Sequence, residues 1–397
     1  ARLDGFRRRG GVIEVIDVRR QPLPAISDQD GVMVTGSHNP SNYNGLKMML
    51  AGEVLFGDAI QGLKARAQSQ DFRDGSGQVQ TMDLMADYVR RVTEDMPVAL
   101  GNALKVVVDC GNGAASEVAP KLIRALGHDV VELFCEVDGN FPNHHPDPAD
   151  PANLETLIQA VADEGADLGL AFDGDGDRIA AVDETGRFCS TQLLMPLLID
   201  HLARARQLPG AVVKTVSGSD LMRLVAEAQG RKVLELAVGF KYIAAEMLAG
   251  DVLIGGEESG GVGFGMHLPE RDALFAAMLV LEALVEGKQP LGARLDALQQ
   301  QHGGSSHYDR LDLRLADMEA RRRLETLLDQ STPSTVAGAD VLEVISTDGI
   351  KLRMGPNHWL MLRFSGTEPL LRLYCEGPDA ERVNEVLAWA RQFAEAA

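Results

Sequence analysis

Three aspartates alternate with glycines in the run Asp173-Gly174-Asp175-Gly176-Asp177, and Arg178 follows at once. In an extended or tightly looped backbone, alternate side chains point to the same side, and glycine lets the chain fold closely around what they face. Three crowded carboxylates repel each other, so a bound cation is the natural compensation. Oxygen ligands suit a hard ion such as Mg²⁺, and an adjacent arginine offers a bidentate donor for phosphate. The run therefore predicts a magnesium site beside a phosphate-binding arginine.

The flanks of this run decide between the metal site and two alternatives, a solvated turn and a calcium-binding EF-hand. Residues 167–172 and 179–182 are mostly apolar, which is typical of two short buried strands. Buried strands on both sides predict a rigid hairpin loop, whereas Asp/Gly-rich turns are usually solvated. An EF-hand needs flanking helices and a glycine at its sixth position, where Arg178 stands. We therefore favour a magnesium-binding hairpin loop.

A serine lies between glycine and histidine in the run Thr35-Gly36-Ser37-His38-Asn39-Pro40, directly after an expected strand over residues 31–34. A hydroxyl on such a loop is exposed enough to act as a nucleophile, and Lys47 places a cation within reach of it. A plain turn ending in Asn-Pro is the alternative interpretation. The run lacks the G-x-S-x-G elbow, and no order of Asp and His indicates an acyl-transfer triad.

Two further loops carry polar side chains between glycines. The run Gly255-Gly256-Glu257-Glu258-Ser259-Gly260-Gly261 follows an apolar strand, and its carboxylates and hydroxyl suit hydrogen bonds to sugar hydroxyls. The run Arg363-Phe364-Ser365-Gly366-Thr367-Glu368-Pro369 combines an arginine, two hydroxyls and backbone N–H groups freed by glycine, which together bind a phosphate dianion. A flexible surface loop and a strand-terminal turn are the respective alternatives. The turn Cys110-Gly111-Asn112-Gly113 has only a weak dinucleotide-binding character, with Glu132 as its acidic partner.

The composition is that of an ordinary globular chain, with 397 residues, 45% hydrophobic and 24% charged. The net charge of −20 argues against nucleic-acid binding, and it requires a local cluster of cations if the ligand is a phosphate. The four cysteines, Cys110, Cys135, Cys189 and Cys375, lie far apart without a CxxC pair and are expected to be free thiols. No apolar run is long enough to cross a membrane and no signal region is recognised, so we expect a cytoplasmic protein without a membrane partner.

Alternation of expected strands and helices divides the chain into four segments, residues 1–98, 99–188, 189–307 and 308–397. The expected fold class is α/β, with mixed sheets in the first three segments and an α+β arrangement in the last. Strands are predicted over residues 12–18, 31–35, 105–109, 167–172, 179–182, 211–215, 252–255, 341–346, 359–364 and 371–376. Helices are predicted over residues 116–126, 153–164, 193–206, 220–229 and 272–286 and from residue 380 onward, with a Gly/Ser-rich linker over residues 301–307.

The polar loops occur in the order serine loop, DGDGDR loop, GExSG loop and RxSGTEP loop, one in each segment. This ordered set resembles that of the α-D-phosphohexomutase family of phosphoglucomutases and phosphomannomutases, over nearly the full chain. The resemblance implies a heart-shaped architecture of four domains with the active site at its centre. The segments would then be a phosphoserine-loop domain, a metal-binding domain, a sugar-binding domain and a phosphate-binding domain, in that order.

The resemblance also implies roles for individual residues. Ser37 would carry the transferable phosphoryl group and complete a Mg²⁺ site formed by Asp173, Asp175 and Asp177. Lys47 and Arg178 would contact the reacting phosphate or assist proton transfer. The residues implied in substrate binding are His38, Lys214, Gly239, Lys241, Glu257 and Ser259, with Arg363, Ser365, Gly366 and Thr367 for the non-reacting phosphate and Arg271 as a weaker candidate.

The activity that the resemblance implies is reversible phosphoryl transfer between the 1- and 6-positions of a hexose, through a phosphoserine enzyme and a hexose 1,6-bisphosphate. Glucose phosphates are favoured over mannose phosphates as substrates. Mg²⁺ and the bisphosphate are the implied cofactors, small sugar phosphates are the expected partners, and the protein is expected to be a monomer or weak dimer. A phosphatase and a non-catalytic protein that binds sugar phosphate or Mg²⁺ are the alternatives.

Two departures from the family pattern carry expectations of their own. The family normally begins with an FGTSGxRG-type segment whose arginine belongs to the active site, and nothing similar precedes Ser37. We therefore expect an incomplete or abbreviated first domain. Residues up to Arg178 are similar to bacterial dual phosphomannomutase/phosphoglucomutases, whereas Gly239-Phe240-Lys241 and the GGEESGG run are more similar to phosphoglucomutases. A chain joined from two branches of the family is the hypothesis that follows.

Overall fold

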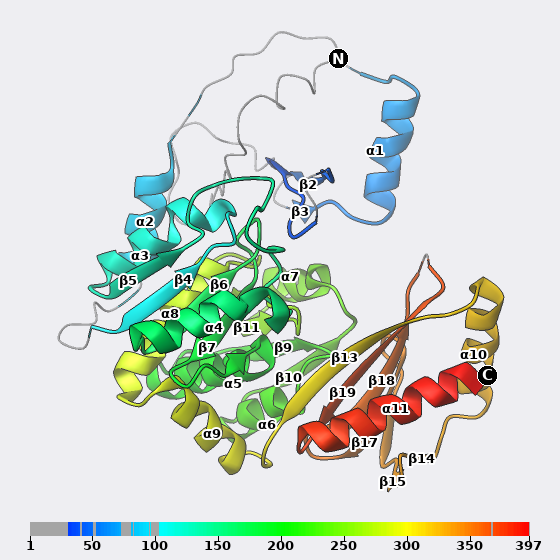
Figure 1. Cartoon of the computed structure of the whole chain (residues 1–397). Helices are drawn as coiled ribbons and strands as arrows, with labels where there is room; N and C mark the ends of the chain where they lie inside the picture. The colour runs from blue at the N-terminus through cyan, green and yellow to red at the C-terminus, as the bar shows by residue number, and fades with distance from the viewer. Residues whose placement is uncertain are drawn as a thin grey trace.

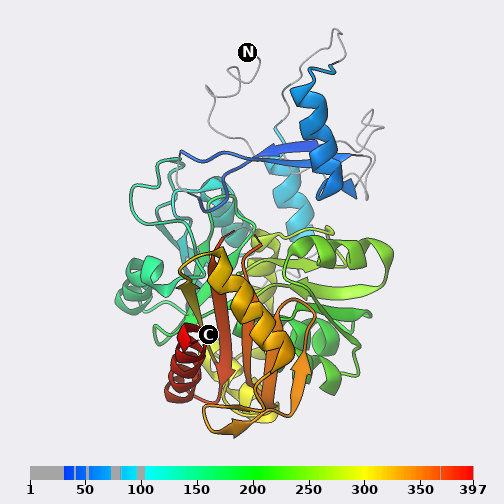
Figure 2. The same cartoon turned by 90° about the vertical axis from the view of Figure 1, so that its right-hand side faces the viewer.

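The computed structural model describes residues 31–39, 42–50, 53–72, 81, 83–94, 96, 103–366 and 368–396. Within these ranges the chain forms four main sheets one after another, and we call the regions around them the first to fourth lobes (Figure 1). The second and third lobes lie together, the fourth lies beside the third, and the strands of the first lie across the top (Figures 1 and 2). The strand predicted over residues 12–18 lies outside the described residues.

The first lobe has a three-stranded sheet in the order β1-β2-β3. Its elements are β1 (Gly31–Val34), β2 (Leu46–Leu50), β3 (Glu53–Val54) and helix α1 (Asp58–Gln68). The strand predicted over residues 31–35 is confirmed as β1. The three described strands pair antiparallel, and the β1–β2 register places Met33 opposite Lys47. The β1–β2 connection therefore returns Lys47 to the neighbourhood of the serine loop.

The second lobe has a five-stranded sheet in the order β5-β4-β6-β7-β8. Its elements are α2 (Met85–Glu94), β4 (Lys105–Asp109), α3 (Ala119–Ala125), β5 (Asp129–Leu133), α4 (Glu155–Glu164), β6 (Leu168–Phe172), β7 (Ile179–Asp183) and β8 (Phe188–Cys189). β4 runs parallel to β5 and β6, while β6–β7 and β7–β8 are antiparallel, so the sheet is mixed. The helix predicted over residues 116–126 begins later than expected. A 3₁₀ turn occupies Ala114–Glu117, and Pro120 lies in the first turn of α3, where its missing N–H needs no partner.

The third lobe has a four-stranded sheet in the order β10-β9-β11-β12, in which only β12 is antiparallel to its neighbour. Its elements are α5 (Thr191–Asp200), β9 (Ala211–Thr215), α6 (Asp220–Ala228), β10 (Val233–Leu236), α7 (Phe240–Ala249), β11 (Val252–Gly256), β12 (Val262–Phe264), α8 (Ala273–Gly287) and α9 (Leu291–Gln301). The helix predicted over residues 193–206 is α5 followed by a π-helical turn over His201–Ala205. The sequence analysis did not expect β10 or α7.

The fourth lobe has a five-stranded antiparallel sheet in the order β13-β19-β18-β17-β16. Its elements are β13 (His307–Arg314), α10 (Met318–Gln330), β14 (Thr335–Val336), β15 (Ala339–Asp340), β16 (Glu343–Ile345), β17 (Ile350–Gly355), β18 (His358–Phe364), β19 (Leu370–Gly377) and α11 (Ala380–Ala396). This lobe is the expected α+β arrangement, and a separate cluster of buried apolar side chains supports it. β13, β17 and α10 were not among the predicted elements.

The largest apolar core crosses from the second lobe into the third. It includes Phe172 at the end of β6, Leu194 on α5 and nearly every apolar side chain of α8. A helix that is apolar on most sides is buried on most sides, so α8 holds the two sheets together. Within the described residues, no helix is both long enough and apolar enough to cross a lipid bilayer. The shared core gives the loops that follow β6 and β11 a rigid base.

Candidate active site

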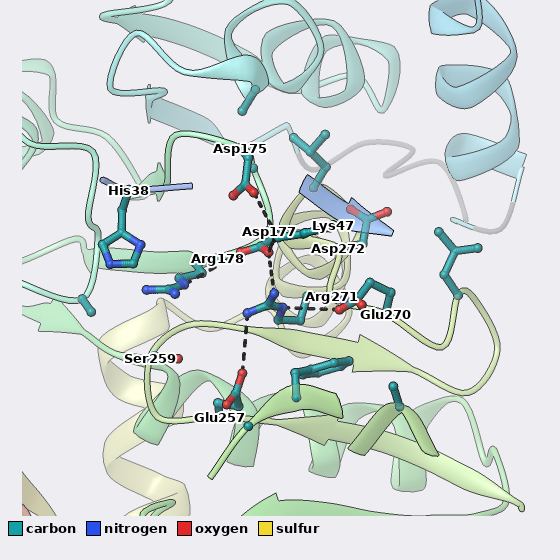
Figure 3. A pocket seen from close by; sticks show the side chains of 18 of the residues that line it. His38, Lys47, Asp175, Asp177, Arg178, Glu257, Ser259, Glu270, Arg271 and Asp272 are labelled. Carbon is teal, nitrogen blue, oxygen red and sulfur yellow. Dashed lines mark hydrogen bonds and ion pairs between the residues drawn. The ribbon is translucent and has the colours of Figure 1, made fainter. Parts of the chain in front are cut away.

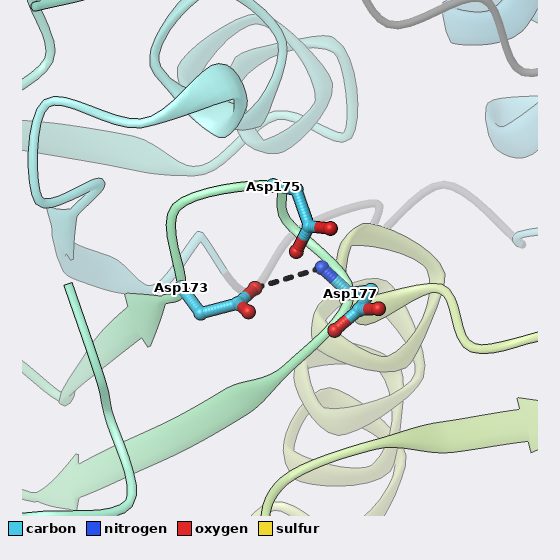
Figure 4. Close-up of side chains that lie close together, drawn as sticks. All are labelled: Asp173, Asp175 and Asp177. Carbon is cyan, nitrogen blue, oxygen red and sulfur yellow. Dashed lines mark hydrogen bonds between the residues drawn. The ribbon is translucent and has the colours of Figure 1, made fainter. Parts of the chain in front are cut away.

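The carboxylate loop, residues 173–178, connects β6 to β7 at one end of a fully buried hairpin. One carboxylate oxygen from each of Asp173, Asp175 and Asp177 lies within 4.8 Å of the other two (Figure 4). The backbone of the loop closes on itself, because Asp173 Oδ1 accepts hydrogen bonds from the N–H groups of Asp177 (2.9 Å) and Arg178 (3.0 Å). The predicted hairpin is confirmed, and the loop lies between strands rather than the helices of an EF-hand.

The protein compensates the charge of this cluster only in part. Burial, together with the charges of Asp177 and Asp175, raises the pKa of Asp173 well above its ordinary value. Burial also opposes the ionisation of Asp175, but Lys47 outweighs it and lowers the pKa of Asp175 to about 2. Two buried oxygens, Asp175 Oδ1 and Asp177 Oδ1, have no hydrogen-bond partner among the described residues. A set of oxygen donors with unpartnered buried acceptors fits a hard divalent cation, and Mg²⁺ better than Zn²⁺.

The serine loop, residues 35–39, follows β1 and touches the carboxylate loop. Ser37 Oγ donates a hydrogen bond to Asp173 Oδ2 over 3.1 Å, and Thr35 Oγ1 donates one to Asp175 Oδ2 over 2.8 Å. Ser37 has a φ of 52°, a left-handed conformation that is uncommon for serine. The approach also requires glycine opposite it, because a Cβ on Gly174 would lie 2.3 Å from the Ser37 carbonyl oxygen. Two loops that are distant in sequence thus form one site.

Three cations surround the carboxylates. Lys47 Nζ donates to Asp175 Oδ2 (2.9 Å) and to Asp177 Oδ2 (2.8 Å). Arg271 Nη2 lies 2.8 Å from Asp177 Oδ2, and Arg178 Nε lies 3.8 Å from Asp177 Oδ1. Burial opposes the charge of Lys47, but the two aspartates outweigh it and raise the pKa of Lys47. Three cations therefore gather where a phosphate ligand would need them in a chain of net charge −20, and each of them is paired with carboxylates of the loop (Figure 3).

Arg271 joins the carboxylate loop to the Glu257 loop, residues 257–261, which connects β11 to β12. Its Nη1 lies 3.6 Å from Glu257 Oε2, so one guanidinium pairs with both loops (Figure 3). Arg178 forms an antiparallel bridge with Gly261, which ties the two backbones directly. A Cβ on Gly261 would lie 2.3 Å from Arg271 Cδ, so the glycine leaves room for the arginine. Arg271 is central to the site, although its sequence context made it only a weak candidate.

Glu257 should make the stability of the protein depend on pH. Burial outweighs the attraction of Arg271 and raises the pKa of Glu257 to about 7, from an ordinary value of 4.5. Between these values the folded state holds a proton that the unfolded state has released, so the free energy of unfolding falls as pH rises from 4.5 to 7. Glu257→Gln cannot ionise. We expect its stability relative to wild type to rise by up to about 3 kcal/mol between pH 4 and pH 8.

Urea denaturation of wild type and Glu257→Gln at several pH values measures this difference. Glu381→Gln, on an exposed part of α11, is the control and should follow the wild-type pH dependence. Parallel pH curves for wild type and Glu257→Gln would contradict the prediction.

One large cavity of about 2480 Å³ lies between the lobes and collects most of the predicted site residues. Those that line it are His38, Lys47, Asp175, Asp177, Arg178, Gly239, Lys241, Glu257, Ser259 and Arg271, whereas Ser37 and Asp173 are not among the described lining residues. The fourth lobe supplies Tyr308, Arg310, Arg372 and Tyr374 from β13 and β19, which the sequence analysis did not single out. Tyr308 and Arg310 are two positions apart on one strand, so they share a face. This spacing of two positions is the sequence signal for Tyr308 and Arg310. Because alternate residues share a face in every strand, the signal does not single them out.

The described residues of the predicted phosphate loop of the fourth lobe are not on the wall of this cavity. Arg363, Ser365 and Gly366 follow or end β18 and are absent from the described lining residues, and Thr367 lies outside the described residues. Arg363 Nε donates instead to Asp348 Oδ2 over 2.8 Å. Its partner in the β18–β19 register, Arg372, does line the cavity. The phosphate-binding role of this loop stays a prediction.

Lys214 is the predicted site residue whose surroundings differ most from the expectation of substrate contact. Its side chain is fully buried on β9, and Nζ donates to Glu235 Oε2 over 2.6 Å. Lys351 Nζ of the fourth lobe lies 3.9 Å from Glu235 Oε1 and 3.5 Å from Asp220 Oδ1. Buried charges need such partners. Lys214 therefore takes part in an ion network between the third and fourth lobes, and it does not line the cavity.

Comparison with known protein families gives one consistent match along the chain. Models described as phosphoglucomutase/phosphomannomutase match with alpha/beta/alpha domain I over residues 13–74, domain II over residues 86–186, domain III over residues 191–302 and the C-terminal domain over residues 311–392. Domain I is thus present in this chain.

Individual relatives agree with the family models. A phosphomannomutase/phosphoglucomutase of Pseudomonas aeruginosa is 35% identical over 388 residues, which are 94% of this chain and 79% of that protein. One of Pseudomonas putida is 43% identical over 289 residues, 69% of this chain and 60% of that protein. A crystal structure of a phosphoglucomutase/phosphomannomutase family protein from Burkholderia thailandensis superposes with a TM-score of 0.80 at 31% identity, covering 92% of this chain and 76% of that one. The Pseudomonas aeruginosa match extends to both sides of the carboxylate loop, and a chain joined from two branches stays a hypothesis.

Proposed function

Because the chain belongs to the phosphoglucomutase/phosphomannomutase family, we propose that it interconverts hexose 1-phosphate and hexose 6-phosphate, with glucose preferred over mannose. The observation that carries this proposal is the 3.1 Å contact between Ser37 Oγ and Asp173 Oδ2 beside a cation-lined cavity of about 2480 Å³. A nucleophilic hydroxyl and a carboxylate cluster of metal-binding type would then lie next to a cavity that a loop suited to sugar hydroxyls lines. A hexose bisphosphate fits within this volume, which exceeds that of ordinary ligand pockets.

The proposed reaction transfers a phosphoryl group twice. The P–O bond to Ser37 Oγ breaks while a P–O bond to a sugar hydroxyl forms, and the hydroxyl proton passes, through a base or water, to Ser37 Oγ. The resulting hexose 1,6-bisphosphate turns over and returns its other phosphoryl group to Ser37 Oγ, which leaves the isomeric monophosphate. Phosphate esters are very inert, so positioning and charge neutralisation supply most of the acceleration.

The residues of the chain divide this work between them. Asp173, Asp175 and Asp177 would hold Mg²⁺, which when bound offsets negative charge on the transferring group. Lys47 and Arg178 would bind the same group from the protein side, with Arg271 aligning the carboxylate and Glu257 loops. The sugar-binding residues of the proposal are His38, Gly239, Lys241, Glu257 and Ser259. The second phosphate would be bound by Arg363, Ser365, Gly366 and Thr367, which requires the fourth lobe to move toward the cavity.

A coupled assay that follows glucose 6-phosphate formation from glucose 1-phosphate, with Mg²⁺ and a trace of glucose 1,6-bisphosphate, tests this function. We expect sustained turnover, with mannose 1-phosphate converted more slowly. Release of inorganic phosphate at the same rate would instead identify a phosphatase. Binding of sugar phosphate with neither product would identify a non-catalytic protein. Either of these last two results would contradict the mutase proposal.

Gly174→Ala tests whether the contact between the serine and carboxylate loops matters. The new Cβ would meet the Ser37 carbonyl oxygen at 2.3 Å, so the serine loop must retreat. Because a misplacement of about 1 Å can cost about 10²-fold, we expect kcat to fall by at least that factor. Gly139→Ala is the matched control, since a Cβ there meets nothing within 4 Å. Equal kcat values for Gly174→Ala and Gly139→Ala would show that the contact is dispensable.

A further inference from the structure

Two of the four cysteines, which the sequence places far apart, lie side by side in the second lobe. The Sγ atoms of Cys110, after β4, and Cys135, after β5, are 3.4 Å apart. The parallel β4–β5 register pairs Asp109 with Leu133, so a regular sheet would set Cys110 beside Phe134 rather than Cys135. Phe134 has a φ of 51°, and this left-handed residue redirects the chain at the end of β5. The left-handed conformation of Phe134 therefore places Cys135 beside Cys110.

The backbone around the two thiols is already joined by hydrogen bonds. The N–H of Cys110 donates to the carbonyl of Leu133 over 3.2 Å, and the N–H of Asn112 donates to that of Phe134 over 2.8 Å. Asn112 Nδ2 donates to the carbonyl of Glu136 over 2.8 Å. A disulfide has an S–S distance of about 2.05 Å, so the sulfurs need to approach by only about 1.4 Å from their 3.4 Å separation. The two segments are thus held in a position from which a disulfide can close.

We propose that Cys110 and Cys135 form a reversible disulfide when the protein meets a peroxide, and that this bond lowers its activity. Cys135 is partly exposed, whereas Cys110 is fully buried, so the oxidant reaches Cys135 first. The hydrogen bond from Cys135, together with burial, raises the pKa of the Cys110 thiol well above its ordinary value, which keeps Cys110 protonated until the second step.

The chemistry balances with hydrogen peroxide as the oxidant. The Cys135 thiolate attacks one peroxide oxygen, the O–O bond breaks, and the released hydroxide takes up the thiol proton to form water. Cys135 is then a sulfenic acid. The Cys110 sulfur attacks Cys135 Sγ, and the displaced hydroxide leaves with the Cys110 proton as a second water. Two thiols are oxidised to one disulfide, and one peroxide is reduced to two waters.

The effect on activity rests on the proposed function and on close packing between the cysteine turn and the carboxylate loop. The N–H of Ala114 donates to the carbonyl of Gly174 over 3.0 Å. A Cβ on Gly113 would lie only 2.8 Å from that carbonyl oxygen and 3.1 Å from the carbonyl oxygen of Asp173. The turn at residues 110–113 is packed directly against the backbone that carries Asp173. Any movement of Cys110 toward Cys135 is therefore transmitted to the backbone of Asp173, whose carboxylate Ser37 contacts.

The test exposes the whole protein to millimolar hydrogen peroxide under native conditions and then alkylates the remaining thiols. We expect the loss of two thiols, a cross-linked peptide that joins Cys110 to Cys135, and a fall in mutase activity of about tenfold or more. Dithiothreitol should restore both the thiols and the activity. Cys135→Ser and Cys110→Ser should form no cross-link and keep their activity through the treatment. Cys189→Ser should behave as wild type, because Cys189 is buried on β8, which β6 and β7 separate from β4 in the sheet.

Peptide mapping and activity report on separate parts of the proposal. Oxidation of Cys135 to a sulfinic acid without any Cys110–Cys135 peptide would overturn the disulfide. A complete cross-link with unchanged activity would overturn the effect on catalysis. If the protein lacked mutase activity altogether, the peptide map would still decide whether the bond forms, so the two failures are distinguishable.

Discussion

Replacing Ser37 with alanine should reduce mutase activity by about 10⁴-fold or more, the scale of loss seen when a covalent nucleophile is removed. The fold fixes the position of this side chain, because Oγ lies 3.1 Å from Asp173 Oδ2 and the residue has a φ of 52°. Alanine removes the only atom of this residue that can carry a phosphoryl group. The coupled assay measures the loss, and intact mass spectrometry should show one added phosphoryl group on active wild type and none on Ser37→Ala.

A second serine in the same lobe serves as a control, which separates the loss of the Ser37 hydroxyl from a general effect of replacing serine with alanine. Ser69, at the end of α1 in the same lobe, is exposed, and among the described residues its hydroxyl bonds only to backbone carbonyls of its own helix. We expect Ser69→Ala to retain wild-type kcat and phosphorylation. Near-normal turnover by Ser37→Ala would remove Ser37 from its proposed role, whatever the state of Ser69.

Replacing Asp175 with asparagine should weaken Mg²⁺ binding severely and lower kcat by about 10²- to 10³-fold, the cost of losing a preorganised electrostatic group. Asp175 Oδ1 is one of the buried acceptors without a hydrogen-bond partner among the described residues. Its pKa of about 2 keeps it ionised across the working pH range. An amide removes the charge. Because Lys47 and Thr35 both donate to Oδ2, the amide oxygen takes that position and the N–H₂ group, which cannot bind a cation, takes the position of Oδ1. Titration calorimetry with Mg²⁺ and the mutase assay measure the two losses.

Chelation of wild type provides the complementary experiment. EDTA should abolish turnover, and added Mg²⁺ should restore it in wild type but not in Asp175→Asn. Asp163→Asn, on the exposed side of α4, is the control for removing one negative charge. Wild-type Mg²⁺ affinity in Asp175→Asn would exclude the carboxylate loop as the metal site.

The individual loops of this site were predictable because each lies within one short stretch of chain. Alternating Asp and Gly between two apolar runs predicted the β6–β7 hairpin and its converging carboxylates, and β11 likewise precedes the Glu257 loop. Less regular elements were missed. β10 has four residues, and one of them is the charged Glu235, so this strand does not stand out in the sequence as an apolar run. Its carboxylate is instead paired with Lys214 inside the protein.

Contacts between loops were not predictable in the same way. Arg271 follows an unremarkable run, and only the packing of β12 and α8 brings its guanidinium between Asp177 and Glu257. Lys214 matched a substrate-binding pattern, yet its position on a buried strand turns it toward Glu235. Cys110 and Cys135 are separated by 25 positions, and the parallel pairing of β4 and β5, together with the left-handed conformation of Phe134, makes them neighbours.

The sequence by itself determined which chemical groups this protein can offer and their order along the chain. Three carboxylates on one glycine-rich loop, a serine loop and a sugar-type loop follow from residue types and spacing, because neighbouring residues have few relative positions open to them. The tertiary structure alone decided which groups meet. The distances between Ser37 and Asp173, and between Arg271 and its two carboxylates, depend on how separate sheets pack. Close packing sets these distances to tenths of an ångström through contacts such as Gly174 against Ser37. The spacing of residues along the chain does not determine such distances.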